Sequence, residues 1–139
     1  MRKVYFSGSI RGGRGFVDEY FEIIKFLKNN FVVLTEHIGD KNLNSSGEKN
    51  KTDEYIFQRD CSWIDESDFV VAEVTNPSLG VGYEICYAEK LNKPILCLYK
   101  NNGNKISAMI NGNKYLSVYP YNNIEEAQEI IDKFTNDLS

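Results

Sequence analysis

Four short, almost continuous apolar runs constrain the fold of this chain more than any other feature of its sequence. They cover residues 4–6, 31–34, 69–72 and 95–99 and are rich in β-branched and aromatic side chains. Runs of this length and composition are typical of β-strands that are buried on both faces. A fifth, weaker strand is predicted around residues 116–119.

Helical periodicity fills much of the sequence between these runs. One apolar stripe extends from Phe16 to Leu27, and a second extends from Ile124 to Phe134. Strands that alternate with helices need crossover connections, which favour parallel strands with helices on both faces of the sheet. The sequence therefore predicts a doubly wound α/β fold of the flavodoxin or Rossmann type, with a five-stranded parallel sheet.

Length and charge limit the kinds of partner that this chain can bind. With 139 residues, we expect residues 1–139 to form a single domain. Lys and Arg number 16 against 20 Asp and Glu, a balance that argues against a nucleic-acid polymer as partner. A small anionic ligand is still compatible with this charge, because a local pocket can bind phosphate whatever the net charge is.

The cysteines and the apolar segments predict where the protein works. Cys61, Cys86 and Cys97 show no short paired spacing, which favours free, buried thiols in a reducing compartment. The first apolar segment has only about four residues, too few for a signal-peptide core, and no stretch approaches the ~18 needed to span a bilayer. We expect a cytoplasmic protein, or a nuclear one in a eukaryotic cell, that has no membrane partner.

Two loops at the predicted carboxyl edge of the sheet carry parts of a phosphate site. In doubly wound sheets, ligands bind at this edge. Residues 7–14 read SGSIRGGR and supply glycines, hydroxyls and guanidinium groups. This loop matches neither the Walker pattern nor G-x-G-x-x-G, so a purely structural turn stays open as the alternative. In the loop before residue 84, Ser78 and Gly80 could offer a second set of donors.

Two carboxylates could face the same cleft. Glu84 falls in the first turns of a predicted helix, where the helix dipole favours an ionised group, although a plain surface glutamate would lie there too. Asp60 shares a helical stripe with Ile56 and Trp63, so it is either paired with a neighbour or borders a cleft. Glycosidic cleavage needs such a pair, one group to attack the anomeric carbon and one to handle the proton.

Three other features are less informative. His37, the only histidine, follows the second strand and could reach the same cleft, but no Cys or carboxylate lies at ligand spacing, so no metal site is expected. Ser107 lies on a predicted short helix, where a serine is ordinary. The polar segment 39–52 is either a mobile flap or a plain surface loop.

Motifs along most of the chain resemble the 2′-deoxynucleoside 5′-phosphate N-hydrolase family. The segment YFSGSIRGGR at residues 5–14 is similar to the start of that family. Further similar segments follow in the same order: LTEH at 34–37, VAEVT at 71–75, PSLGVGYE at 77–84, ILCL at 95–98 and SAMI at 107–110. More distantly, residues 83–88 resemble the nucleophile segment of the nucleoside 2-deoxyribosyltransferases, which have a flavodoxin-like fold.

The resemblance implies an N-glycosidase that converts 2′-deoxynucleoside 5′-monophosphates to free base and 2-deoxyribose 5-phosphate. By that resemblance, Glu84 attacks the anomeric carbon to form a covalent glycosyl-enzyme, Asp60 assists departure of the base, and Tyr5 orients Glu84. No metal or organic cofactor is expected, because a carboxylate stabilises the positive charge that develops on the sugar.

The resemblance also assigns binding positions and a homodimer. The phosphate positions are Ser9, Arg11, Gly12, Gly13, Ser78, Gly80 and, from the neighbouring subunit, Ser107. Ile10 and Ile56 would flank the base, with His37 as a further candidate beside the base or sugar. Departures from the family pattern at residues 15–16, 44–46 and 49–51 leave the preferred base open.

Three alternative functions stay open. A deoxyribosyltransferase would pass the same covalent intermediate to a second base instead of to water. A ribonucleotide N-glycosidase that acts on substrates such as CMP would need a pocket that accepts the 2′-hydroxyl. A nucleotide-binding sensor without turnover would use the phosphate cradle alone, although the pairing of Glu84 with Asp60 argues against it.

Overall fold

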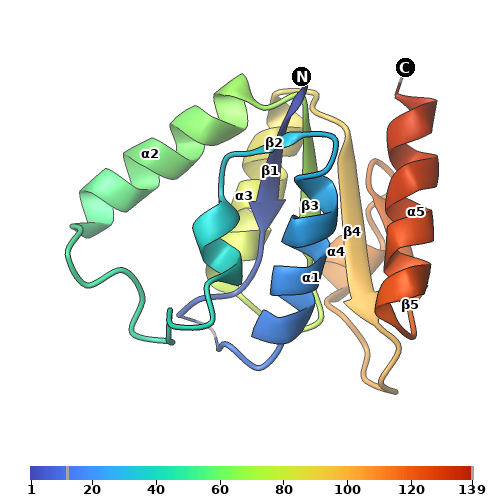
Figure 1. The fold of residues 1–139 in the computed structure, drawn as a ribbon, viewed down its shortest axis with the longest axis horizontal. Helices are drawn as coiled ribbons and strands as arrows, with labels where there is room; N and C mark the ends of the chain where they lie inside the picture. Colours follow the sequence, from blue (N-terminus) through green and yellow to red (C-terminus); the bar gives the residue numbers. More distant parts are fainter. Residues whose placement is uncertain (12, 139) are drawn as a thin grey trace.

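A computed structural model, which describes residues 1–11 and 13–138, shows a five-stranded parallel sheet with helices on both faces (Figure 1). Its strands are β1 (Lys3–Ser7), β2 (Val32–Val33), β3 (Phe69–Glu73), β4 (Ile95–Lys100) and β5 (Ser117–Tyr121). Their order is β2-β1-β3-β4-β5, and every neighbouring pair is parallel. This is the flavodoxin order of a doubly wound sheet, so the predicted fold class is confirmed.

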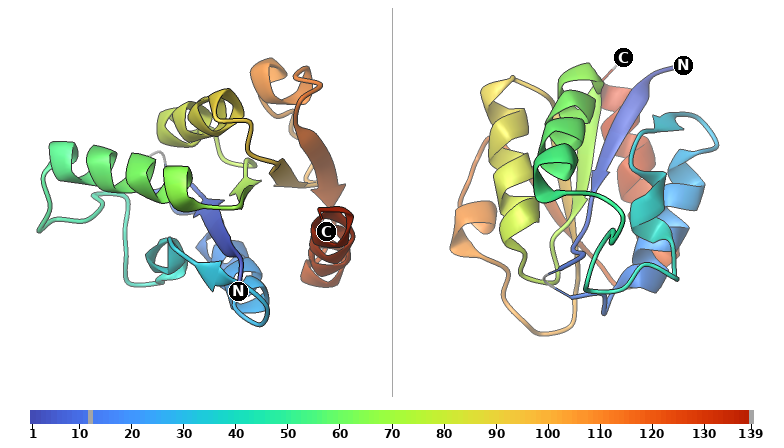
Figure 2. Two further views of the ribbon diagram at one scale, coloured as in Figure 1. Left: turned by 90° about the horizontal axis from the view of Figure 1, so that it is seen from above. Right: turned by 90° about the vertical axis from the view of Figure 1, so that its left-hand side faces the viewer.

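The long helices cover the sheet in two pairs (Figure 2). The pair α1 (Val17–Leu27) and α5 (Ile124–Asp137) packs on one face, and the pair α2 (Asp53–Glu66) and α3 (Leu79–Lys90) packs on the other. The short elements are the 3-10 helix η1 (Glu36–Gly39) and α4 (Ala108–Asn111). None of the helices in the described part of the chain is long and apolar enough to span a membrane.

Alternation along strand β1, which lies inside the sheet, divides the core into two layers. Val4 and Phe6 belong to the layer under α1 and α5, whereas Tyr5 belongs to the layer under α2 and α3. Because successive side chains of a strand point to opposite faces, Ser7 shares the face of Tyr5. Two hydroxyl groups of β1 are therefore aimed at the same pair of helices.

Two details differ from the sequence prediction. Strand β2, at one edge of the sheet, contains only Val32 and Val33 of the predicted run 31–34. Phe31 instead packs edge to face against Phe69, with ring centroids 5.1 Å apart. All three cysteines are free, as predicted, but only Cys97 is buried, since Cys61 is half-buried on α2 and Cys86 is exposed on α3.

A buried carboxylate fixes the chain where it leaves β3. Glu73 has no exposed surface, and its oxygens accept hydrogen bonds from the backbone N–H and hydroxyl of Thr75, at 2.8 and 2.7 Å, and from the hydroxyl of Tyr121, at 2.5 Å. Burial raises the pKa of Glu73, and these donors lower it. The contacts tie the loop after β3 to the end of β5 at the carboxyl edge of the sheet.

We expect Tyr121→Phe to lower the free energy of unfolding by about 1–3 kcal/mol, because a buried carboxylate oxygen then lacks one donor. Tyr119→Phe is the matched control, since it removes a hydroxyl from a half-exposed tyrosine on the same strand. Urea denaturation of both variants at neutral pH measures the difference. Equal stabilities for the two variants would contradict this role of Tyr121.

Candidate active site

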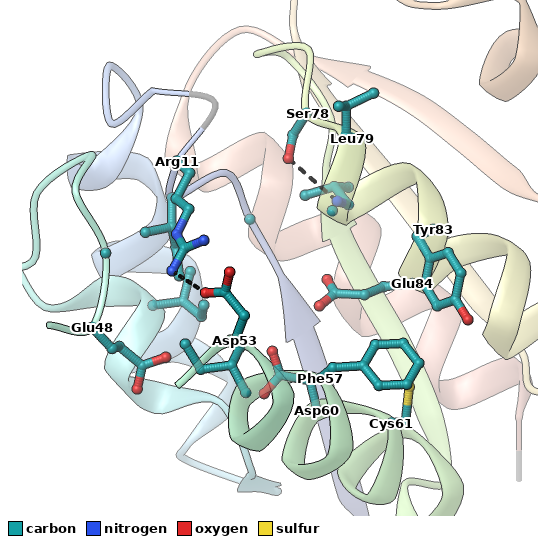
Figure 3. Close-up of a pocket in the computed structure, with 17 residues that line it drawn as sticks. Arg11, Glu48, Asp53, Phe57, Asp60, Cys61, Ser78, Leu79, Tyr83 and Glu84 are labelled. Carbon is teal, nitrogen blue, oxygen red and sulfur yellow. Dashed lines mark hydrogen bonds and ion pairs between the residues drawn. The ribbon is translucent and has the colours of Figure 1, made fainter. Parts of the chain in front are cut away.

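A pocket of about 580 Å³ opens at the carboxyl edge of β1 and β3 (Figure 3). Its walls are the loop after β1, part of the segment 40–52, one face of α2 and the first turns of α3. The loop residues follow strands that lie side by side in the sheet, which brings them to one place. This is the position where doubly wound folds bind their ligands.

Glu84 lies in the second turn of α3 and is held by both hydroxyl groups of β1. The Tyr5 hydroxyl donates to Oε2 of Glu84 at 2.6 Å, and the Ser7 hydroxyl donates to Oε1 at 2.7 Å. Burial raises the pKa of Glu84 to about 7, although these two hydrogen bonds lower it. Hydrogen bonds to both oxygens therefore fix the orientation of the carboxylate, and a pKa of about 7 means that its charge changes near neutral pH.

Asp60, on α2, points into the same pocket as Glu84 (Figure 3). Its Oδ1 accepts a hydrogen bond from Nε of Arg59 at 2.9 Å. Burial raises the pKa of Asp60, and the positive charge of Arg59 opposes this rise. The sequence left open whether this aspartate is paired or borders a cleft, and the structure shows that it does both.

Asn76 joins the two loops that were predicted to bind phosphate. Its side-chain amide donates to Oγ of Ser9 at 3.1 Å and to the carbonyl of Gly13 at 3.3 Å. Gly13 has a φ of +131°, and a Cβ on it would lie 2.8 Å from the Asn76 amide nitrogen, so this position requires glycine. Sequence reasoning missed Asn76, whose one signal was its place in the loop after β3.

The predicted phosphate positions are only partly brought together in a single chain. Arg11, Ser78 and Gly80 line the pocket, and Ser9 is buried beneath it, whereas Gly12 lies outside the described residues. Ser78 also caps α3, since its hydroxyl accepts a hydrogen bond from the N–H of Val81 at 3.3 Å. Arg11 is paired with Asp53 at 2.8 Å, so an incoming phosphate would compete with that carboxylate.

Ser107 lies away from this pocket. It caps the short helix α4 and is exposed, and it lines a second cavity of about 500 Å³ between α3 and α4. Within one subunit it therefore does not line the cleft that contains Glu84 and Asp60. This second cavity shares Ser78 and Val81 with the first, so the two adjoin at the start of α3.

Arg14, the second guanidinium of the predicted cradle, has a different role from the one expected. It donates hydrogen bonds of 2.7 to 3.2 Å to the backbone carbonyls of Ser9, Ile38, Asp40 and Leu43. These carbonyls belong to the loop after β1, to η1 and to the segment that follows η1. Arg14 therefore fastens these two parts of the chain together instead of facing a ligand.

Ile10 and Ile56, which were expected to flank the base, line the pocket, but His37 does not. Nε2 of His37 lies 3.6 Å from the carboxylate of Glu48, which takes the position on the pocket wall. Burial lowers the pKa of His37, while the charge of Glu48 raises it. The side chain thus points toward the segment 40–52. In the described residues, no group of three His, Cys, Asp or Glu side chains could hold a metal ion.

The fold and this pair of carboxylates are compatible with a nucleoside 2-deoxyribosyltransferase-like protein, and the comparison with known families shows this class. The sequence model described as nucleoside 2-deoxyribosyltransferase matches residues 4–133. The chain belongs to this family, which confirms the resemblance seen in its motifs.

Relatives of known name are similar over nearly the whole chain. A protein of Tetraodon nigroviridis named 5-hydroxymethyl-dUMP N-hydrolase is 44% identical, over 96% of this chain and 98% of the relative. A protein of the same name from Danio rerio is 42% identical, over 98% of this chain and 97% of the relative. The structure of the CMP N-glycosidase BcmB from Clostridium botulinum has the same fold, with a TM-score of 0.65 at 18% identity over 94% and 99% of the two chains.

We expect Glu84→Gln to stabilise the protein at high pH. Folding raises the pKa of this carboxyl from 4.5 to about 7, so the folded state binds its proton more tightly than the unfolded state does. Its contribution to stability is therefore complete below pH 4.5 and is lost as the pH rises through about 7. The variant should be more stable than the native protein by about 1–3 kcal/mol at pH 8, with little difference at pH 5.

Denaturation curves at both pH values measure this effect, and Glu129→Gln on the exposed surface of α5 is the control. A stability difference that does not change with pH would show that burial of the Glu84 charge costs nothing.

Proposed function

We propose that this chain hydrolyses the N-glycosidic bond of 2′-deoxynucleoside 5′-monophosphates to free base and 2-deoxyribose 5-phosphate. The observation that carries the proposal is that Glu84 and Asp60 face one pocket, with Glu84 held by Tyr5 and Ser7. Relatives at 42% and 44% identity that are named as N-hydrolases of a deoxynucleotide support the same class of reaction.

In the proposed first step, ionised Glu84 attacks C1′ of the deoxyribose while the bond to the base breaks. The electron pair of that bond goes to the base, and protonated Asp60 supplies a proton to it. The product is a glycosyl ester on Glu84. Tyr5 and Ser7 hold the carboxylate in line for the attack and donate to it throughout.

In the proposed second step, water replaces Glu84 on C1′. Asp60 is now ionised and takes a proton from the water as its oxygen attacks, so the same residue acts first as acid and then as base. Glu84 leaves as a carboxylate, and 2-deoxyribose 5-phosphate is released. A substrate without a 2′-hydroxyl suits this chemistry, because its oxocarbenium-like transition state forms more easily.

The proposed binding mode places the 5′-phosphate between the two strand-end loops. The N-terminus of α3 offers backbone N–H groups beside Ser78 and Gly80, and Arg11 supplies a positive charge from the opposite side. Ser9, Gly12 and Gly13 would complete the loop after β1. Ile10 and Ile56 would flank the base, since both present apolar surface to the pocket.

Turnover of a panel of deoxynucleoside monophosphates, 5-hydroxymethyl-dUMP included, tests the proposal through chromatographic detection of the free base. We expect Glu84→Ala to lose at least about 10³-fold in kcat and Asp60→Asn about 10²-fold or more. In the native protein, kcat/KM should fall as the pH drops below about 7, because Glu84 becomes protonated. Unchanged turnover in Glu84→Ala would exclude the covalent mechanism, and mass spectrometry of quenched reactions would detect the glycosyl ester.

The same assay separates the alternatives. Formation of dAMP from dGMP and free adenine would identify a transferase, and equal release of base from CMP and dCMP would identify an enzyme that accepts ribose. A sensor would bind nucleotides and release no base at all.

We also propose a homodimer in which Ser107 of the partner subunit completes the phosphate site. Ser107 is exposed in the single chain, and Leu79 and Met109, at the starts of α3 and α4, are 96% and 81% exposed. These exposed apolar side chains offer surface that a second subunit would cover. A shared site would also explain why Ser107 lies outside the pocket of its own subunit.

We expect Ser107→Ala to raise KM about 10-fold while kcat changes little, because phosphate binding lies far from the reacting bond. A mixture of Ser107→Ala with Glu84→Ala should regain a low-KM component, since the second variant supplies an intact Ser107 to the intact Glu84 of the first. Sedimentation at assay concentrations checks the assembly. A monomer with full activity would contradict the shared site.

The proposed enzyme acts as one catalytic domain on a small molecule in the cytoplasm or, in a eukaryotic cell, the nucleus. Free thiols at Cys61, Cys86 and Cys97 support a reducing compartment. The pocket has the size of a nucleotide site, which supports a mononucleotide as substrate rather than a polymer.

A further inference from the structure

Arg59 links the segment 40–52 to the pocket, and neither the sequence motifs nor the proposed mechanism gives it a role. Its Nη1 and Nη2 donate to the two oxygens of Glu48 at 2.7 and 2.8 Å. Its Nε donates to Oδ1 of Asp60 at 2.9 Å. One cation therefore bridges a carboxylate of the segment and the carboxylate that is proposed to move the proton.

Aromatic and polar side chains surround the guanidinium of Arg59. It lies over the ring of Trp63, 4.6 Å from the centroid, and its Nη2 lies 3.4 Å from Nε2 of His37. The side chains of Arg59 and Glu48 are only 11% and 14% exposed. A planar fork with two bonds to one carboxylate has a fixed direction, so Nε stays aimed at Asp60.

Arg59 and Glu48 act on Asp60 in opposite directions. The positive charge of Arg59 favours the ionised form of Asp60, whereas the negative charge of Glu48 favours the protonated form. Burial is the main reason that the pKa of Asp60 is raised although an arginine contacts it. Glu48 adds to this effect, because it lies against the guanidinium and offsets part of the field that Arg59 alone would impose.

We infer that Arg59 is a positioning residue for the proposed reaction: anchored on Glu48, it directs the carboxylate of Asp60 into the pocket, while Glu48 balances its charge. The inference rests on the proposed function for the role of Asp60 as proton donor. Glu48 belongs to the segment 40–52. The contact that anchors Arg59, and through it directs Asp60, therefore forms only while this segment lies against the pocket.

Charged or titratable groups face Asp60 from each neighbouring element, and the test must separate their effects. They are Arg59 and Cys61 on α2, Tyr5 on β1, Glu84 on α3, Glu48 in the segment 40–52 and, through Arg59, His37 on η1. Of these groups, only Glu48 and Arg59 are substituted, so the other listed groups are the same in the variants that are compared.

The direct test is a ¹³C NMR titration of the Asp60 carboxyl, assigned by its loss in Asp60→Asn. We expect the titration midpoint to move to higher pH in Arg59→Gln and to lower pH in Glu48→Gln. Lys49→Gln, which removes an exposed charge next to Glu48, should leave the midpoint unchanged. If Arg59 and Glu48 had only a structural role, both substitutions would admit water and move the midpoint in the same direction, or neither would move it. Either result would overturn the inference.

Arg59→Lys separates charge from orientation. Lysine keeps the positive charge but cannot form the two-point contact with Glu48, so the midpoint of Asp60 should stay near the native value while kcat for base release falls about 10-fold. Arg59→Gln and Glu48→Gln should lower kcat more than they raise KM. A native kcat in Arg59→Lys would show that orientation by the fork has no role.

The outcomes for the two proposals remain distinct. Absence of base release by the native protein would refute the proposed function, whereas the NMR titration needs no turnover and decides by itself whether Arg59 and Glu48 balance the charge at Asp60.

Discussion

The chemistry proposed for this fold depends on the two hydrogen bonds by which hydroxyl groups of β1 hold the carboxylate of Glu84. A carboxylate that enters a partly buried pocket loses hydration, and this loss raises the pKa of Glu84 to about 7. Tyr5 and Ser7 return part of the lost stabilisation through hydrogen bonds to both oxygens. Because β1 is paired with β2 on one side and β3 on the other, these donors have little freedom to move.

The rest of the pocket is assembled around that contact by the order of the strands. Adjacent β1 and β3 end side by side, so the two loops that follow them meet, and Asn76 bonds one to the other. Behind this junction, Glu73 and Tyr121 fix the start of the second loop. The structure thus supports its binding loops with buried polar networks that bring no charged group of their own into the pocket.

The sequence predicted the fold because the strands and helices depend on local patterns, namely apolar runs and helical stripes. Glu84 and Asp60 stood at identifiable places on predicted helices, but position alone left each with an ordinary structural alternative, and the family resemblance assigned their roles. Contacts between distant parts of the chain could not be read in the same way. Ser7 could have been found from its two-residue spacing to Tyr5, but the pairing of Arg59 with Glu48 depends on how the segment 40–52 folds back.

Side-chain direction was the other limit of the sequence analysis. Arg14 and His37 occur where a ligand site was expected, yet Arg14 turns to backbone carbonyls and His37 turns to Glu48. Their position in the loops was predictable, but the partner that each side chain selects is a property of the folded chain. The exposure of Cys86 follows from the same limit, because its helix presents only one face to the sheet.

The ion pair between Arg11 and Asp53 at the pocket mouth has a consequence for which molecules can enter. In the proposed binding mode, a doubly charged phosphate would displace the Asp53 carboxylate from Arg11, whereas an uncharged nucleoside would not form an ion pair with Arg11. The displaced carboxylate is not left without stabilisation, since Asp53 is the first residue of α2 and the positive end of that helix dipole lies beside it. Binding would then begin with the replacement of one anion by another on Arg11. This step would favour nucleotides over nucleosides before the sugar or the base is contacted.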